Sequence, residues 1–104
     1  MYELDKVESE ATSMIRNLED YASPEKMPVN ILTPMDRGYI RKEPYGVVLI
    51  VGTWNFPFLV CLSPLVGAIA AGNVVIIKPS EVAPFSANIL AHLIPQYLDR
   101  VCKM

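Results

Sequence analysis

The run from Tyr45 to Ile77 contains no charged residue, and it limits what this chain can fold into more than any other feature. Such a run could either cross a membrane or form the buried part of a domain. A membrane helix needs about 20 uninterrupted apolar residues. Prolines, glycines and asparagines interrupt this run at short intervals, and each would have to be accommodated in lipid. The sequence therefore favours a buried core, with a membrane-associated segment as the weaker alternative.

Composition narrows the class of protein without locating a site. The chain has 104 residues, 52% of them hydrophobic and 19% charged, which suits one small folded domain. The net charge of −2 comes from scattered acids and bases, so we expect no nucleic-acid partner. Cys61 and Cys102 lack CxxC spacing, which argues against a disulfide framework and against a metal site. The N-terminus does not resemble a signal peptide, so we expect a cytoplasmic protein with no membrane span in this chain.

Residues 1–22 are predicted to form an amphipathic helix. Apolar side chains recur there at intervals of three and four residues: Leu4, Val7, Ala11, Met14 and Leu18. The helix is expected from about Glu3 to Tyr21, because the Ser23-Pro24 pair disfavours its continuation. Residues 23–44 hold four prolines and are expected to form an extended connector.

Residues 45–104 are predicted to form part of a parallel α/β domain. The stretches 47–51 and 74–77 are short, apolar and rich in β-branched residues, as is typical of strands covered on both faces. Helical stretches follow each of them. The order strand, helix, strand, helix indicates parallel strands joined by right-handed crossovers.

The two helices of this domain have recognisable ends. Residues 57–71 begin with a proline, contain Pro64, which should kink the helix, and stop at Gly72-Asn73. Residues 84–98 form the second helix. Four apolar residues of that helix are expected to point toward the core: Phe85, Ile89, Leu93 and Leu98.

Two loops leave the carboxyl ends of the predicted strands, which is where open α/β sheets bind ligands. The loop 52–55 leads into a helix N-terminus, whose free N–H groups favour an anion. The loop 78–81 carries Lys78 and Glu81. A carboxylate there can accept hydrogen bonds from both hydroxyls of a ribose, and the ammonium can donate to them. This is the chemistry of a dinucleotide site, although the G-x-G-x-x-G motif is absent.

Each candidate residue also has a simpler interpretation. Asn55 is a good N-cap for the helix that begins near residue 57. Lys78 and Glu81 could form an ion pair at the surface, where it would contribute little stability. Trp54 could be an aromatic residue of the core.

A longer pattern resembles a known family. The string GVVLIVGTWNFPFLVCLSPLVGAIAAGNVVIIKPSEVAPFSANIL looks like the N-terminal coenzyme-domain core of aldehyde dehydrogenases, with W-N-x-P and K-P-S-E blocks at that family's separation. The flanking YIRKEPYG and LIPQYLDR are similar to the class 3 branch, which handles fatty and aromatic aldehydes. The resemblance covers about residues 15–100. It implies a fragment of a Rossmann-like parallel-sheet coenzyme-binding domain, β-α-β-α, preceded by the amphipathic helix.

The resemblance implies roles for five loop residues. Asn55 matches the asparagine whose side-chain amide donates to the oxyanion formed when a thiolate attacks the aldehyde. Lys78 and Glu81 match the pair that holds the adenosine ribose of the coenzyme, NAD or NADP. Thr53 and Trp54 match the backbone wall beside that coenzyme. The resemblance also implies an aldehyde substrate and a homodimer.

The nucleophilic cysteine and the general-base glutamate of that family have no match in this sequence. Cys61 falls among apolar residues of the helix after Asn55 and is expected to be an inert, buried thiol. Cys102 has no matching surroundings. We therefore expect a fragment of a longer NAD(P)-dependent aldehyde dehydrogenase, marginally stable and inactive alone. The alternative is a truncated, non-catalytic module that pairs with full-length subunits.

Overall fold

A parallel sheet organises the structure, as the sequence predicted. The computed structural model describes residues 1–99 and the backbone of residues 102–103. In it, β3 (Val47–Val51) and β4 (Val74–Lys78) pair in parallel along their whole length. A third strand, β5 (Cys102–Lys103), pairs in parallel with the other edge of β4 and was not predicted. The strand order is therefore β3-β4-β5.

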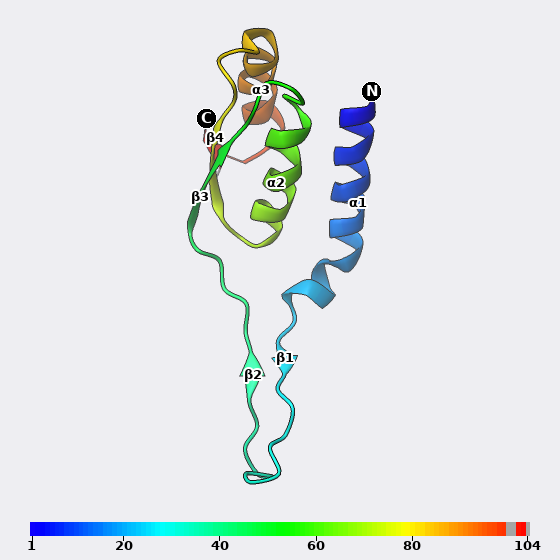
Figure 1. Ribbon diagram of the computed structural model, residues 1–104, viewed down its shortest axis with the longest axis vertical. Helices are drawn as coiled ribbons and strands as arrows, with labels where there is room; N and C mark the ends of the chain where they lie inside the picture. The colour runs from blue at the N-terminus through cyan, green and yellow to red at the C-terminus, as the bar shows by residue number, and fades with distance from the viewer. Residues whose placement is uncertain (100–101, 104) are drawn as a thin grey trace.

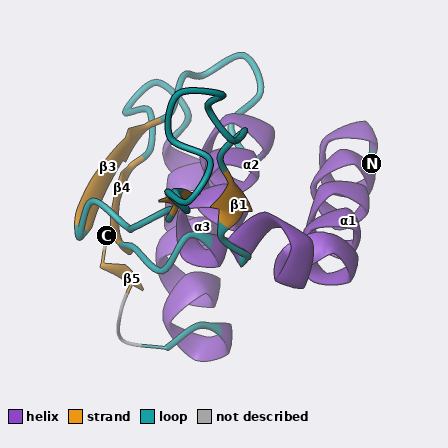
Figure 2. Cartoon of the chain, turned by 90° about the horizontal axis from the view of Figure 1, so that it is seen from below, coloured by secondary structure: helices purple, strands orange, loops and turns teal. Residues whose placement is uncertain are grey.

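Two helices connect these strands and cover one face of the sheet. α2 (Leu59–Ala70) joins β3 to β4, and α3 (Pro84–Tyr97) lies between β4 and β5. Successive strands are added in one direction, and parallel crossovers are right-handed, so both helices must lie on the same face. Figure 2 shows them together on one side of the β3–β4 ribbon. The predicted α/β architecture and both helices are confirmed, with α2 slightly shorter than expected.

The expectation that the strands are covered on both faces is wrong. Ile50 and Val75 lie beneath the helices and are 6% and 0% exposed. Leu49 and Val51 point to the opposite face and are 62% and 60% exposed. Apolar residues occupy both faces of the strands, which is why the pattern predicted two-sided burial. The helices nevertheless cover only one of them.

The prediction of which face of α3 points toward the core is also wrong. Leu90 and Ile94 pack into the core and are 4% and 5% exposed. Three residues predicted to be inward are instead 83%, 48% and 42% exposed: Phe85, Ile89 and Leu93. Only Leu98 packs against the core as expected. α3 carries apolar residues at four-residue spacing on two faces, so periodicity alone could not choose between them.

The core is a single cluster where the sheet, α2 and α3 meet. It consists of Ile50, Cys61, Leu65, Val75, Ile77, Leu90 and Ile94. Most of these residues come from the charge-free run, and their burial accounts for it. Within the part of the chain that the structure describes, no helix is both long enough and apolar enough to cross a bilayer.

Gly72 and Asn73 end α2 as predicted. The Gly72 backbone has a φ of 84°, which favours glycine. The Asn73 N–H donates to the Ala68 carbonyl at 3.0 Å and the Gly72 N–H to the Ile69 carbonyl at 2.9 Å, which together form a Schellman motif. The buried Asn73 side chain then accepts a hydrogen bond from the Gly46 N–H at 3.0 Å. This contact ties the end of α2 to the start of β3.

α1 (Tyr2–Ala22) confirms the predicted N-terminal helix and forms the outer layer of the molecule. It packs along α2, on the side away from the sheet (Figure 2). Val7, Ala11 and Met14 of its apolar stripe are half-buried there. The outer surface of α2 therefore covers part of this stripe.

Residues 23–44 form a projecting arm. β1 (Glu25–Lys26) and β2 (Tyr39–Ile40) pair in antiparallel fashion, and the arm runs away from the helices (Figure 1). It accounts for much of the 60 Å length of the molecule. At its base, the Lys42 ammonium pairs with Glu25 at 3.0 Å and donates to the Tyr21 carbonyl at 3.3 Å. The domain boundaries inferred from the sequence stay a prediction.

The two faces of α3 provide a test of this packing. Leu90→Ala should lower the free energy of unfolding by about 2–5 kcal/mol, because it leaves a cavity in the core. Leu93→Ala removes the same atoms from the exposed face of the same helix and should cost less than about 1 kcal/mol. Urea denaturation of the two variants measures both values. Equal losses would contradict the assignment of the buried face.

Candidate functional site

The two predicted loops meet at the carboxyl ends of β3 and β4. Val51 is paired with Lys78 at the last position of the parallel register. One residue further, the Gly52 N–H donates to the Lys78 carbonyl at 2.9 Å. This hydrogen bond joins the first residue of the loop 52–55 to the first residue of the loop 78–81. The candidate residues therefore lie at one edge of the sheet, as the strand order predicted.

Gly52 is required at this position by Cys61, which lies directly beneath it. A Cβ atom built on Gly52 would collide with the Cys61 Sγ. The Cys61 side chain is completely buried, and this burial raises the pKa of its thiol. A buried thiol with a raised pKa forms little thiolate. The prediction of a buried thiol is confirmed, and Cys61 packs beneath the first residue of the Asn55 loop.

Asn55 forms a hydrogen bond within its own loop. The Thr53 hydroxyl donates to the Asn55 Oδ1 at 2.6 Å, and both side chains are exposed. Asn55 does not cap α2: the N-cap position is Phe58, and no side chain of that position makes a capping bond. The N-cap interpretation is therefore wrong. The Asn55 side chain is free of any role in holding the helix.

Glu3 from α1 caps α2 instead. One oxygen of its carboxylate accepts hydrogen bonds from the Phe58 N–H at 3.0 Å and the Leu59 N–H at 2.9 Å. These are among the unpaired N–H groups that begin every helix. These N–H groups hold an anion, as the sequence predicted, and the anion is the chain's own carboxylate. Sequence reasoning missed Glu3, because nothing local shows which distant helix end a first-turn acid will reach.

A second contact ties α1 to α2 one turn further along. The Ser63 hydroxyl donates to the Glu10 carboxylate. Glu3 and Glu10 lie seven positions apart, which places them on the same face of α1. The two carboxylates thus anchor that face along the first half of α2.

Lys78 and Glu81 form the predicted ion pair. The Lys78 ammonium lies 2.6 Å from a Glu81 carboxylate oxygen, and the two side chains are 56% and 80% exposed. The hydrogen bond from Lys78 is the main cause that holds the pKa of Glu81 below its ordinary value. Because both groups face solvent, the pair contributes little to stability. The position and the charges of this ion pair matter more for binding a ligand than its contribution to stability does.

The side chains of Lys78 and Glu81 carry a donor and an acceptor that can pair with the hydroxyls of a ribose. One Glu81 oxygen accepts from Lys78, and the other can accept from a hydroxyl. The ammonium also donates to the Pro79 carbonyl at 3.5 Å, which leaves it one further proton to donate. Trp54 is 64% exposed, so its interpretation as a core aromatic is wrong. It stands in the neighbouring loop with an open aromatic surface. These groups can bind a polar, planar ligand such as a dinucleotide.

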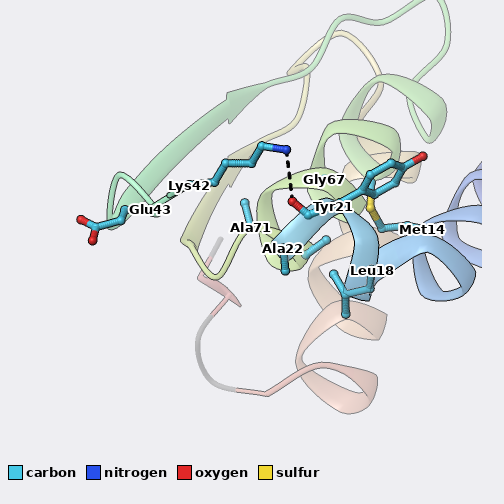
Figure 3. A pocket seen from close by; sticks show the side chains of 9 residues that line it. Met14, Leu18, Tyr21, Ala22, Lys42, Glu43, Gly67 and Ala71 are labelled. Atoms are coloured by element: carbon cyan, nitrogen blue, oxygen red, sulfur yellow. Dashed lines mark hydrogen bonds between the residues drawn. The ribbon is translucent and has the colours of Figure 1, made fainter. Parts of the chain in front are cut away.

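A separate cavity lies at the other end of α2, between α1, α2 and the base of the arm (Figure 3). Its volume is about 320 Å³, and its lining includes Met14, Leu18 and Tyr21. Among the described residues that line it, Lys42 is the only base. The Lys42 ammonium is already held by a carbonyl and a carboxylate, and Figure 3 shows the first of these contacts. The cavity therefore presents no free cation to a nucleotide.

Comparisons with known proteins agree with this geometry. The profile of the "Aldehyde dehydrogenase family" matches residues 2–98. Aldehyde dehydrogenase family 3 member A2 of Rattus norvegicus is 52% identical over 99 residues, which are 95% of this chain and 20% of that protein. The dimeric NADP-preferring aldehyde dehydrogenase of Canis lupus familiaris is 52% identical over 100 residues, 96% of this chain and 21% of that protein.

A solved structure is also similar to this chain. The substrate-bound state of Staphylococcus aureus AldH superposes with a TM-score of 0.83 at 36% sequence identity, over 94% of this chain and 21% of that one. The chain thus spans about a fifth of the length of the proteins that it matches.

The capping role of Glu3 can be measured by substitution. Glu3→Ala should lower the free energy of unfolding by about 1–2 kcal/mol, because two partly buried N–H groups lose their acceptor. Asp5→Ala is the control, since Asp5 is also an acid in the first turn of α1 but is exposed. It should cost only about 0.3–1 kcal/mol through the helix dipole. Chemical denaturation that gave equal losses would show that Glu3 acts only on its own helix.

The contact between Gly52 and Cys61 predicts a specific rescue. Gly52→Ala should cost about 1–3 kcal/mol, because the new methyl group collides with the Cys61 Sγ. In a Cys61→Ala background the same change should cost less, because the methyl group fills the space that sulfur leaves. Gly67→Ala serves as the control. Gly67 lies within α2, and a Cβ atom there would meet no neighbouring atom, so the change should raise the free energy of unfolding by about 0.5–1 kcal/mol. A Gly52→Ala cost that is the same in both backgrounds would refute the collision.

Proposed function

Because this chain belongs to the aldehyde dehydrogenase family, we propose that its two loops supply the oxyanion donor and the ribose contacts for an NAD(P)-dependent oxidation of aldehydes to carboxylic acids. The observation that carries the proposal is the junction of the loops at the end of the parallel pair. The Gly52–Lys78 hydrogen bond places the Asn55 loop beside the Lys78–Glu81 pair. The similarity to class 3 members at about half identity over nearly the whole chain supports it.

Asn55 is the proposed oxyanion donor. When a thiolate adds to an aldehyde, the carbonyl oxygen gains negative charge, and a fixed N–H donor stabilises that charge more than it stabilises the aldehyde. The Asn55 side chain is exposed at the carboxyl end of β3 and is not used to cap α2. Its amide N–H group is thus available for this interaction.

Lys78 and Glu81 are the proposed ribose contacts. The lowered pKa of Glu81 keeps its carboxylate ionised at neutral pH, so it can accept from two adjacent hydroxyls. The ammonium donates to the same hydroxyls while it remains paired with Glu81. Bound NAD or NADP would supply the hydride acceptor of the reaction. A relative of this chain is named as NADP-preferring, so both coenzymes belong in the first assay.

Cys61 is not the nucleophile in this proposal. It is completely buried, its pKa is raised, and it supports the loop from beneath. The sequence has no match to the nucleophilic cysteine or the general-base glutamate of the family. We propose that the 104-residue chain has no dehydrogenase activity by itself. Aldehyde-dependent NADH or NADPH formation by the purified 104-residue chain would contradict this.

A second candidate function is a non-catalytic module that pairs with longer dehydrogenase subunits. The uncovered sheet face favours it, since Leu49 and Val51 are largely exposed and their burial would gain about 25 cal/mol per Å². The relative from Canis lupus familiaris is named as dimeric, which supports a dimer as the paired form. Co-purification of the chain with a longer dehydrogenase subunit would support this candidate. A monomer in light scattering that captures no such subunit would exclude it.

The roles of the two loops predict opposite kinetic effects in the dehydrogenase that contains these residues. Asn55→Ala should lower kcat by about 100- to 1,000-fold with little change in the KM for coenzyme, since it removes a donor to the developing charge. Glu81→Ala should mainly raise the KM for coenzyme. Glu43 is an exposed acid at the base of the arm. Glu43→Ala is the control and should change neither constant. Exchanged effects would mean that the two roles are misassigned.

A further inference from the structure

We propose that Thr53 is a positioning residue for Asn55: its hydroxyl holds the Asn55 carboxamide so that the Nδ2 group faces outward as the donor. This inference deepens the function proposed above and rests on it. The observation is the hydrogen bond in which the Thr53 Oγ1 donates to the Asn55 Oδ1 at 2.6 Å. Because this hydroxyl is bonded to the Asn55 side chain, we expect its effect to pass through Asn55.

A carboxamide must be held in one orientation if its NH₂ group is to act as the donor. An asparagine side chain presents an acceptor oxygen on one side and a donor NH₂ on the other, and the two sides have almost the same shape. If the group rotated by half a turn, Oδ1 would face the developing negative charge and repel it. In the structure the Thr53 hydroxyl donates to Oδ1, so rotation of the carboxamide has to break this bond. Among the described residues, Asn55 Nδ2 has no hydrogen-bond partner, so it is left for an outside acceptor.

The backbone of the loop is already fixed at both ends. On one side, the Gly52 N–H is bonded to the Lys78 carbonyl at the end of β4. On the other side, the Glu3 carboxylate holds the N–H groups of Phe58 and Leu59. These bonds hold the two ends of the loop, and the contact from Thr53 restricts the Asn55 side chain between them.

Threonine suits this task better than its near neighbours. Its β-branch restricts rotation about χ1, so the hydroxyl keeps its direction. Serine keeps the hydroxyl but loses that stiffness, whereas valine keeps the shape and loses the donor. The structure therefore predicts an order in which serine largely preserves the orientation of Asn55 and valine abolishes it.

The first test measures the Asn55 side chain by NMR on the full 104-residue chain. The Nδ2 resonance is assigned by its loss in Asn55→Ala, and its ordering is followed by ¹H–¹⁵N NOE in wild type, Thr53→Val and Thr53→Ser. We expect an ordered amide in wild type, a clearly lower NOE in Thr53→Val and a nearly wild-type value in Thr53→Ser. Unchanged backbone signals of β3 show that the variants remain folded. An NOE that is the same in Thr53→Val as in wild type would overturn the proposal.

The second test separates this inference from the proposed function. In the dehydrogenase that contains these residues, Thr53→Val should lower kcat by about 3- to 10-fold, the effect of one neutral hydrogen bond, with the KM for coenzyme unchanged. Thr53→Ser should recover most of the loss. When Thr53→Val is added to an Asn55→Ala background it should have no further effect, because no amide remains to be oriented.

The outcomes of the two tests are distinct. If Asn55→Ala leaves kcat unchanged, the proposed oxyanion role fails, and the NOE still decides whether Thr53 orders the amide. If Asn55→Ala lowers kcat but Thr53→Val does not, the oxyanion role stands and Thr53 is not a positioning residue. A loss in Thr53→Val that persists in the Asn55→Ala background would also overturn the inference, because a general effect on folding would produce it.

Discussion

Parallel pairing of β3 with β4 is the interaction on which the rest of the structure depends. Parallel neighbours cannot be joined by a tight turn, so the chain must cross over, and α2 is that crossover. The handedness of the crossover decides which face of the sheet α2 covers, and α3 repeats it in the same direction. One face is therefore buried and the other stays open. The same pairing brings the carboxyl ends of both strands together, and with them the two loops.

Charged groups from distant parts of the chain complete the ends of two helices. Glu3 on α1 pairs the first N–H groups of α2, and Lys42 at the base of the arm pairs the Tyr21 carbonyl in the last turn of α1. Each contact satisfies backbone groups that a helix end leaves unpaired. Each also fastens an outer element to the one inside it. While Glu3 closes the N-terminus of α2, Lys78 and Glu81 present their charges to solvent at the same edge of the sheet.

The candidate site combines residues with separate tasks. Contact between Cys61 and Gly52 positions the start of the Asn55 loop, since the Cys61 sulfur fills the space that a side chain on Gly52 would need. The Thr53 hydroxyl contacts the Asn55 carboxamide within that loop. The proposed oxyanion role of Asn55 needs both contacts, because a donor that stabilises a developing charge must already point at it. A buried thiol that resists ionisation suits the supporting role.

Local patterns in the sequence were enough to predict the α1 helix, the strand-helix-strand-helix order and the two loops at the strand ends. They also sufficed for the family resemblance, because the blocks that carry it are short and contiguous. Periodicity could not decide which face of α3 is buried, since Leu90 and Leu93 are equally apolar and only the position of the sheet separates them. The Glu3 contact with α2 joins residues more than fifty positions apart, and no local signal predicts such a partner. Sequence by itself determined α1, α2, α3, β3 and β4. The tertiary structure decided which of their surfaces meet, because contacts between distant segments depend on the direction of the crossovers.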